Sequence, residues 1–337
     1  MKEFFFEYGL FLAKSVTVVA AIVTVLIVIA VIASRKRFDK KDRLKIKKLN
    51  KKYDDMAMAM NASMLPKNQF KKFLKSTQKK EKDENKQTDE NIKKRIFVVD
   101  FQGDIRASAV AALKEEINAI LTVASENDEV FLRLESAGGV VHGYGLAASQ
   151  LMRLRARNIQ LTVSVDKVAA SGGYMMACVG HRILAAPFAI IGSIGVIAQI
   201  PNFNRVLKKH DVEFEQFTAG EFKRTVTMFG ENSNEAKAKF REEIEDIHLL
   251  FKDFIVNNRP DVDIAMVSTG ESWPGTRALE RKLIDEIITS DDYLMTSSKN
   301  ADIYEIKFVA KKNISTWISA SLQQVFDKLQ SLNHLQN

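Results

Sequence analysis

Cysteine and proline are scarce in this sequence of 337 residues, which contains one cysteine, five prolines and fifteen glycines. The lone Cys178 cannot form an internal bridge, so no disulfide framework holds the fold. The low glycine and proline content excludes a collagen-like chain, and a hydrophobic content of 46% excludes a wholly disordered one. The chain is therefore long and apolar enough to form one large folded domain or two.

The net charge of +8 is concentrated in one short stretch. Residues 35–52 contain eleven basic and two acidic residues, a net charge of +9, so the remainder is close to neutral. We therefore expect no nucleic acid among the partners of this protein. Basic residues beside a membrane contact anionic lipid headgroups and help to fix the orientation of a span, which makes membrane lipid an expected partner.

A long uncharged run precedes this basic stretch. Residues 15–34 read SVTVVAAIVTVLIVIAVIAS, and a helix of about 20 residues spans the ~30 Å hydrocarbon core of a bilayer. The run ends directly at Arg35, Lys36 and Arg37 rather than at a small-residue cleavage site, as in a stop-transfer segment. The pattern predicts an uncleaved single-pass anchor within residues 1–34, and the positive-inside rule favours a cytoplasmic location for everything that follows.

A polar segment separates the anchor from the first strand-like run. Residues 67–94 are dominated by Lys, Glu, Asp, Asn and Gln, which predicts a mobile tether because too little apolar surface is available to offset the entropy of ordering. Residues 35–94 are thus expected to be a basic juxtamembrane segment and tether. The folded domain is expected over residues 95–312, and an apolar stripe predicts an amphipathic helix over residues 313–337.

The expected folded domain alternates strands with helices. Strand-like runs at 96–101, 130–134 and 159–165 flank helical patterns at 108–124 and 145–155. This βαβαβ order predicts an α/β fold with a mostly parallel sheet and crossover helices. Ligands of such folds usually bind beyond the carboxyl ends of the strands, so the turns at those ends are the first places to look for chemistry.

Two glycine-rich turns follow predicted strands. One contains Gly138 and Gly139 in ESAGG, and the other contains Ser171 and Gly172 in AASGGY. Glycine permits tight turns, and a turn entering a helix can direct N–H groups at an anion or a developing oxyanion. A hydroxyl at the second turn would lie where the reactive groups of α/β enzymes are found, which makes Ser171 a candidate nucleophile.

A serine nucleophile needs a base that removes its proton. His142 lies in GGVVHGYG, next to the first turn, but no acidic partner that would orient it is evident. Lys167 precedes the serine turn, and Lys223 follows a strand-like run in TAGEFKR. Spacing alone does not choose among these three residues.

Taken together, these motifs resemble the SohB and signal peptide peptidase A family of membrane-anchored Ser–Lys peptidases, which have a ClpP/crotonase-like fold. The resemblance covers the apolar run, the charged segment and residues 96–288. It implies that Ser171 is the nucleophile and that Lys223, about fifty residues later, is the base. The GSIGV segment likewise implies that Ser193 supports the lysine amine.

The same resemblance implies that the N–H groups of Gly139 and Gly172 form the oxyanion hole. Ala137 stands where the family usually has proline, which makes that turn less rigid but leaves the glycine N–H in place. Family members are ring-like oligomers in which neighbouring subunits complete one active site, so a homo-oligomer is expected. No cofactor and no metal are implied.

The expected function is that of a serine endopeptidase of the bacterial inner membrane. Its expected substrates are signal-peptide remnants or unfolded, membrane-derived polypeptides. The related signal-peptide-processing enzymes point to a periplasmic domain, in contrast to the basic stretch, so the side of the membrane stays open. Two alternatives are an acyl-CoA hydratase or isomerase that uses Glu135 on the same fold, and a non-catalytic membrane scaffold or chaperone.

Overall fold

The computed structural model describes residues 2–35, 43–86, 93–220 and 222–309, which belong to two compact units. The first unit contains helix α1 (Lys2–Arg35). Within it, the stretch Phe6–Val25 is long and apolar enough to cross a membrane, and the predicted span over residues 15–34 lies in the same helix. The amphipathic helix predicted over residues 313–337 lies outside the described residues.

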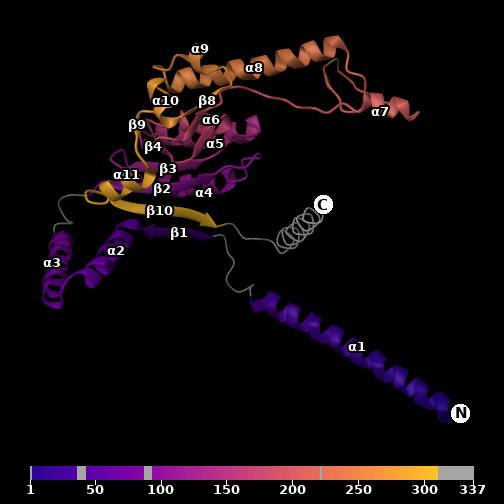
Figure 1. Ribbon diagram of the computed structural model, residues 1–337, viewed down its shortest axis with the longest axis horizontal. Helices are drawn as coiled ribbons and strands as arrows, with labels where there is room; N and C mark the ends of the chain where they lie inside the picture. Colours follow the sequence, from indigo (N-terminus) through magenta and orange to yellow (C-terminus); the bar gives the residue numbers. More distant parts are fainter. Residues whose placement is uncertain (1, 36–42, 87–92, 221, 310–337) are drawn as a thin grey trace. The chain divides into compact units, whose positions relative to one another are not determined.

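The second unit, Leu44–Phe308, is built on a seven-stranded sheet (Figure 1). The strand order is β1 (Arg43–Lys48), β10 (Asp302–Val309), β2 (Arg95–Gln102), β3 (Glu129–Glu135), β4 (Gln160–Val165), β6 (Arg182–Ala185) and β9 (Glu286–Ile287). Every neighbouring pair from β10 to β9 is parallel. The predicted α/β fold with a mostly parallel sheet is confirmed.

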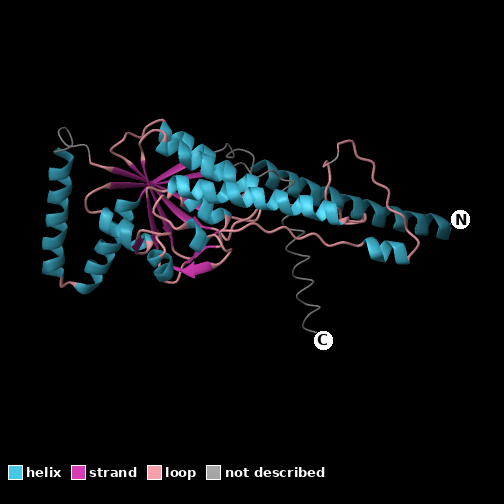
Figure 2. Ribbon diagram, turned by 90° about the horizontal axis from the view of Figure 1, so that it is seen from above, coloured by secondary structure: helices cyan, strands magenta, loops and turns pink. Residues whose placement is uncertain are grey.

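Helices cover both faces of this sheet, as Figure 2 shows from above. The larger core lies under α4 (Val110–Leu121), α5 (Val141–Arg155) and α6 (Gly172–Ala177). On the opposite face, α2 (Leu49–Met64) and α11 (Ser290–Ser297) contribute Leu49 and Leu294 to a smaller core. The central strands are apolar on both sides because both of their faces are covered, which is typical of parallel sheets.

A second, three-stranded sheet lies beyond the main one. It consists of β5 (Val168–Ala170), β7 (Ile190–Gly192) and β8 (Ser272–Pro274). Strands β5 and β7 are parallel, with Ala170 paired to Gly192, and β8 runs antiparallel to β7, with Trp273 opposite Ile191. The mostly buried Trp273 ring packs against Gly192. This sheet therefore fixes two chain segments, those after Ala170 and Gly192, beside each other.

Residues 43–86 contain one strand and two helices. Strand β1 joins the sheet, and α2 and α3 (Lys67–Lys86) follow it. Asn50 anchors α2, because its amide donates to the carbonyls of Ser298 and Ala301 and its oxygen accepts from the Ile303 N–H. Most side chains of residues 43–77 face solvent, and Leu49 is buried, so this part of the segment looks polar in sequence.

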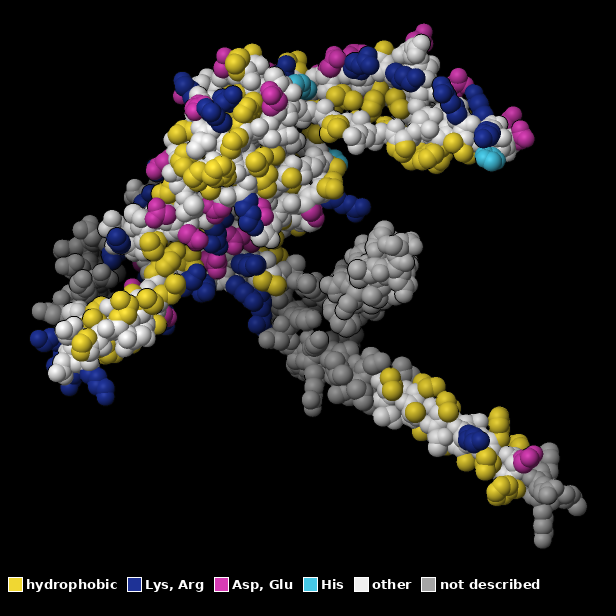
Figure 3. All heavy atoms as spheres, viewed as in Figure 1, with side chains coloured by type: hydrophobic (Ala, Val, Ile, Leu, Met, Phe, Trp, Pro, Cys, Tyr) yellow, Lys and Arg dark blue, Asp and Glu magenta, His cyan; other side chains and the backbone are white. Residues whose placement is uncertain are grey.

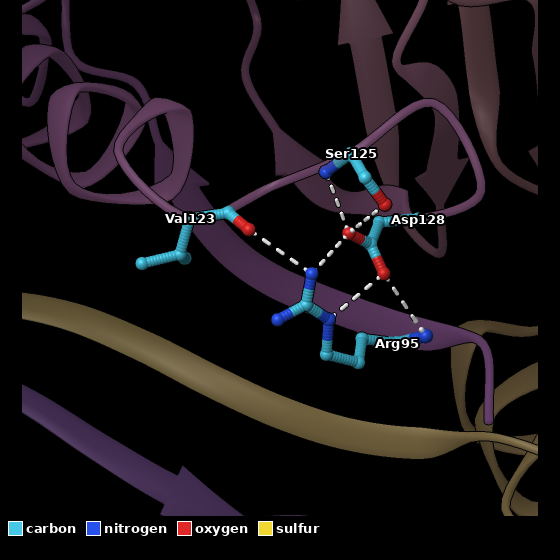
Figure 4. Close-up of polar contacts among 4 residues, drawn as sticks. All are labelled: Arg95, Val123, Ser125 and Asp128. Atoms are coloured by element: carbon cyan, nitrogen blue, oxygen red, sulfur yellow. Dashed lines mark hydrogen bonds and ion pairs between the residues drawn. The ribbon is translucent and has the colours of Figure 1, made fainter. Parts of the chain in front are cut away.

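A charged network secures the start of β2 (Figure 4). The Arg95 guanidinium donates to both oxygens of the buried Asp128, at 2.9 and 2.6 Å, and to the carbonyl of Val123. Ser125 adds its N–H and hydroxyl to the same carboxylate. Burial raises the pKa of Asp128, but these hydrogen bonds outweigh it and hold that pKa below its ordinary value. Strand β2 is therefore fixed to the loop before β3.

Residues 195–220 and 222–250 belong to an arm that leaves the sheet and returns to it (Figures 1 and 2). The chain runs outward after β7 to α7 (Asn204–Lys209), and α8 (Asn234–Asn258) carries it back. The buried residues of α8 are Phe251 and Ile255, near its inner end. Hydrophobic side chains lie on the surface of the arm in Figure 3, and Phe217 is 89% exposed.

Candidate active site

Ser171 lies at the junction between β5 and α6, where the chain turns sharply. Its φ and ψ angles are 52° and −119°, a region that residues with a side chain rarely occupy and that costs about 1–3 kcal/mol. The Ser171 N–H donates to the carbonyl of Gly192 at 2.7 Å, and the Ser171 carbonyl accepts from the N–H of Met175. These two hydrogen bonds hold the strained turn, which leaves the serine side chain partly exposed at the end of the strand.

A small cavity of about 80 Å³ opens at Ser171. Its polar edge is the backbone of Gly139 and Gly172 together with Ser171. The rest of its wall is mainly apolar and includes Val141, Tyr144, Met175, Val196, Ile197, Ile247 and Phe251. Side chains from α5, α6 and α8 therefore enclose an apolar space directly beside a hydroxyl.

The ESAGG turn lies against the serine turn. At Gly138, whose φ is 91°, an added Cβ would come within 2.8 Å of the Ser171 Cβ and 2.9 Å of the Gly172 nitrogen. A Cβ at Gly139 would collide with the carbonyl of Ile105. Within the described part of the chain, no group accepts a hydrogen bond from the N–H of Gly139 or of Gly172. Two backbone donors thus remain available at the edge of the cavity.

A tyrosine that the sequence did not single out supports both turns. The Tyr144 hydroxyl lies 2.6 Å from the Ser136 hydroxyl and donates to the carbonyl of Asp104, while Ser136 accepts from the Gly138 N–H. The Tyr144 ring also fills the space beside Gly172. Burial raises the pKa of Tyr144, so its hydroxyl stays a donor. A tyrosine eight residues after Ser136 gives no signal of this role, because the contact arises from packing of α5.

Ser193 is the neighbour of Ser171 across the small sheet. It directly follows Gly192, which pairs with Ala170 in the parallel β5–β7 ladder. Its φ is also positive, at 51°, and its N–H donates to the carbonyl of Glu271 at 2.6 Å. Adjacent strands lie about 4.8 Å apart, so the two serines lie side by side where their strands end.

Lys223 lies on the arm, and the chain itself does not bring it to Ser171. It is exposed and does not line the cavity at Ser171. The neighbouring Phe222 ring lies 5.2 Å from the Lys239 ammonium of α8. The cavity begins further along that helix at Ile247, eight residues and about 12 Å away along the axis.

The two other candidate bases also lie away from Ser171. His142 is exposed at the start of α5 and does not line the cavity. Lys167 forms an ion pair of 3.0 Å with Glu135 and lines a different, polar cavity of about 290 Å³. Neither residue is hydrogen-bonded to Ser171 in the described structure.

Comparison with known proteins identifies the family. Residues 3–151 match the model of peptidase family S49 N-terminal, and residues 153–304 match that of peptidase family S49. A probable protease SohB from Buchnera aphidicola subsp. Schlechtendalia chinensis is 50% identical over 304 residues, covering 87% of this chain and 99% of the relative. The chain belongs to peptidase family S49. Other S49 relatives include the probable protease SohB of Haemophilus influenzae, 47% identical over 91% of this chain and 90% of its own length.

A third relative, the probable protease SohB of Buchnera aphidicola subsp. Schizaphis graminum, is 46% identical over 96% of both chains. The resemblance inferred from the motifs is therefore confirmed. As a member of S49, the chain is a peptidase, and this decides against the acyl-CoA hydratase and scaffold alternatives. A serine nucleophile is consistent with that family.

Proposed function

We propose that this S49 peptidase is a membrane-anchored serine endopeptidase in which Ser171 is the nucleophile and Lys223 of a neighbouring copy is the general base. The observation that carries the proposal is the strained position of Ser171 at an apolar cavity, beside the N–H groups of Gly139 and Gly172. A strained nucleophile turn next to unused backbone donors is what acyl transfer requires.

In the proposed reaction, Lys223 first accepts a proton from Ser171 and later donates it to the leaving amine. The neutral Lys223 amine takes the proton of the Ser171 hydroxyl as its oxygen attacks the peptide carbonyl. The N–H groups of Gly139 and Gly172 stabilise the oxyanion, and the lysine then gives its proton to the leaving amine. Water hydrolyses the acyl-enzyme with the same lysine as base, and the Ser193 hydroxyl holds the lysine amine beside Ser171.

The exposed surface of the arm favours a base that comes from a second copy of the chain. It carries Lys223 together with exposed apolar residues, among them Phe217 at 89% and Ile197 at 78% exposure. Exposed apolar surface of this kind marks an interaction site, and a ring of identical subunits would cover it. Lys223 would then reach Ser171 of the adjacent subunit and complete the site, since none of His142, Lys167 and Lys223 of the same chain lines the cavity.

The size of the cavity favours substrates with a small or medium aliphatic side chain at the residue before the cleaved bond. About 80 Å³ lined by Val141, Met175 and Phe251 accommodates such a side chain but not a large aromatic one. Apolar, extended chains of this composition occur in signal-peptide remnants and in unfolded or membrane-derived polypeptides, which would pair with a sheet edge. Helix α1 would anchor the enzyme in the bacterial inner membrane as a single span.

Subunit complementation tests the shared site. Ser171→Ala and Lys223→Ala are each expected to abolish proteolysis, but co-expression of the two differently tagged variants should restore it. Random mixing places an intact serine beside an intact lysine in about a quarter of the sites. Phe217→Asp, which puts a charge on the arm, should reduce oligomerisation and activity together.

Two outcomes would contradict the proposal. If the co-purified variants stay inactive although they assemble, the two residues do not act across a subunit boundary. If Lys223→Ala keeps its activity while His142→Ala loses it, the base is misassigned.

A further inference from the structure

Strand β1 and the start of α2 form a groove with a basic rim. The groove has a volume of about 630 Å³ and is open to solvent. Ile46, Met56 and Ala59 supply its apolar surface. Its rim is formed by Lys47, Lys48, Lys51, Lys52 and Asp55, and we refer to this site as the basic groove.

The charge of the basic groove is unbalanced. Four lysines face one carboxylate, that of Asp55, across the lining. Lys48 is partly neutralised by an ion pair of 2.8 Å with Asp302, whereas Lys47, Lys51 and Lys52 are exposed. The flanking Lys45 adds a further exposed cation on β1. Each such lysine is attracted to the negative surface potential of an anionic bilayer.

An apolar ridge runs along α2 from the edge of the basic groove. Met56, Met60 and Met64 are spaced by four residues, so they lie on one side of the helix. They are 57%, 62% and 71% exposed. Flexible apolar side chains beside lysines are typical of surfaces that lie in a membrane interface, whereas a nucleic-acid surface needs no such ridge.

The covalent chain keeps the basic groove near the membrane. Seven residues, 36–42, join the end of α1 at Arg35 to the start of β1 at Arg43. A fully extended chain spans at most about 3.6 Å per residue, so these two ends are never more than about 29 Å apart. The start of β1 therefore stays within roughly one bilayer thickness of the end of α1.

We propose that the basic groove and the adjoining methionine ridge bind the anionic phospholipid headgroups of the membrane in which α1 is anchored. Such docking would hold the peptidase unit at the bilayer surface, where polypeptides released from the membrane first become available. It rests on the proposed anchoring of α1 and is independent of the identity of the catalytic base.

Lipid-dependent quenching of a probe in the groove tests this proposal on the full chain. Ala59→Cys provides an exposed attachment site for a nitrobenzoxadiazole fluorophore. The native Cys178 is fully buried, and burial raises its pKa to about 12, so it does not compete for the label. The labelled protein is placed in nanodiscs of phosphatidylcholine alone or of phosphatidylcholine with phosphatidylglycerol, each with and without a headgroup spin-labelled lipid.

We expect quenching to be at least about twofold stronger with phosphatidylglycerol, and to fall back in about 1 M salt, where the Debye length is only about 3 Å. The triple variant Lys47→Gln, Lys51→Gln and Lys52→Gln should quench equally in both lipids. A matched variant, Lys114→Gln, Lys282→Gln and Lys299→Gln, removes the same charge elsewhere and should behave like the parent.

The possible failures are distinguishable. A chain that does not enter nanodiscs overturns the anchor and, with it, this proposal. A chain that enters them but shows the same quenching in both lipids, or an equal loss in both triple variants, overturns the proposed lipid site alone. Peptidase activity measured on each variant shows that the fold is retained.

Discussion

Ser171 and Ser193 occupy equivalent positions at the ends of two paired parallel strands, with φ angles of 52° and 51°. Each N–H is already committed to a carbonyl, that of Gly192 for Ser171 and that of Glu271 for Ser193. The backbone at both positions is therefore fixed by hydrogen bonds, and the two hydroxyls remain as side-chain groups at one sheet edge. In the proposed mechanism the Ser171 hydroxyl attacks while the Ser193 hydroxyl orients the base.

Removal of the second hydroxyl should slow the reaction without weakening substrate binding. We expect Ser193→Ala to lower kcat about 10- to 100-fold with KM nearly unchanged, because the lysine amine is less well oriented when the proton moves. Steady-state kinetics on a peptide substrate provides the measurement.

Ser193→Thr, which keeps a hydroxyl, should recover part of the rate if its extra methyl group is accommodated. A loss that appears in KM rather than kcat would instead give Ser193 a role in substrate binding. Ser171→Ala should leave no covalent adduct with a fluorophosphonate.

The contact between Gly138 and the serine turn provides a second prediction. Gly138→Ala forces a Cβ to within 2.9 Å of both the Ser171 Cβ and the Gly172 nitrogen, and its φ of 91° disfavours any side chain. We expect activity to fall at least about 100-fold, since a displacement of roughly 1 Å at the reacting groups has that cost. Activity and thermal unfolding of the variant check this.

Gly145→Ala is the matched control, because nothing lies within 4 Å of a Cβ at that helical position. It should keep full activity and gain about 0.5–1 kcal/mol of stability. Equal activity in the two alanine variants would show that the ESAGG turn does not shape the site.

The strands and the turn at Ser171 could be predicted from the sequence because both depend on local patterns. The apolar run at 96–101 lies in β2, and Ser171 lies at the predicted strand-to-helix junction. Because alternating strands and helices allow few topologies, the sequence pattern predicts the parallel sheet directly.

The arm and the contacts of Tyr144 that hold the turns at the site could not be predicted from local patterns. Tyr144 reaches Ser136 because α5 packs across the sheet, and no local pattern encodes that contact. The position of α2 could not be predicted from composition, because it depends on a few distant partners, such as the carbonyl of Ser298 that accepts from Asn50. Lys223 lies on the arm and does not line the cavity at Ser171, and its spacing in the sequence does not encode that position.

Specificity should change when the cavity is enlarged. Met175 lines the apolar wall beside Ser171, and Met175→Ala makes room for a larger side chain before the cleaved bond. We expect the ratio of kcat/KM for phenylalanine over alanine at that position to rise about 10- to 200-fold, since one methylene in such a pocket is worth about 1–3 kcal/mol. A panel of peptides that differ at this residue measures the ratio.

Met152→Ala offers a control on α5, where the side chain is 42% exposed and does not line the cavity. Its substrate preference should match that of the parent. An unchanged preference in Met175→Ala would place the specificity pocket elsewhere.

The buried carboxyl of Glu116 should make stability fall as pH rises. Burial raises the pKa of Glu116 to about 7, a shift that the hydrogen bond from the Phe308 N–H and the charge of Lys307 only partly oppose. A carboxyl that binds its proton more tightly in the folded state stabilises the protein most below its unfolded pKa, and this contribution is lost as pH rises towards the folded value. Glutamine keeps the acceptor for Phe308 without titrating. Glu116→Gln should therefore be more stable than the parent by about 1–3 kcal/mol at about pH 8, with the difference shrinking towards about pH 5.

Chemical denaturation of the full chain in detergent, repeated across this pH range, measures the effect. Glu115→Gln is the control. The Glu115 carboxylate, next to Glu116 in the chain, is partly exposed and accepts a hydrogen bond from Asn118. The control should show no comparable dependence on pH. If Glu116→Gln instead lowered stability by the same amount at both ends of the range, the carboxyl would be ionised in the folded protein, and the end of β10 would depend on a buried negative charge rather than on a retained proton.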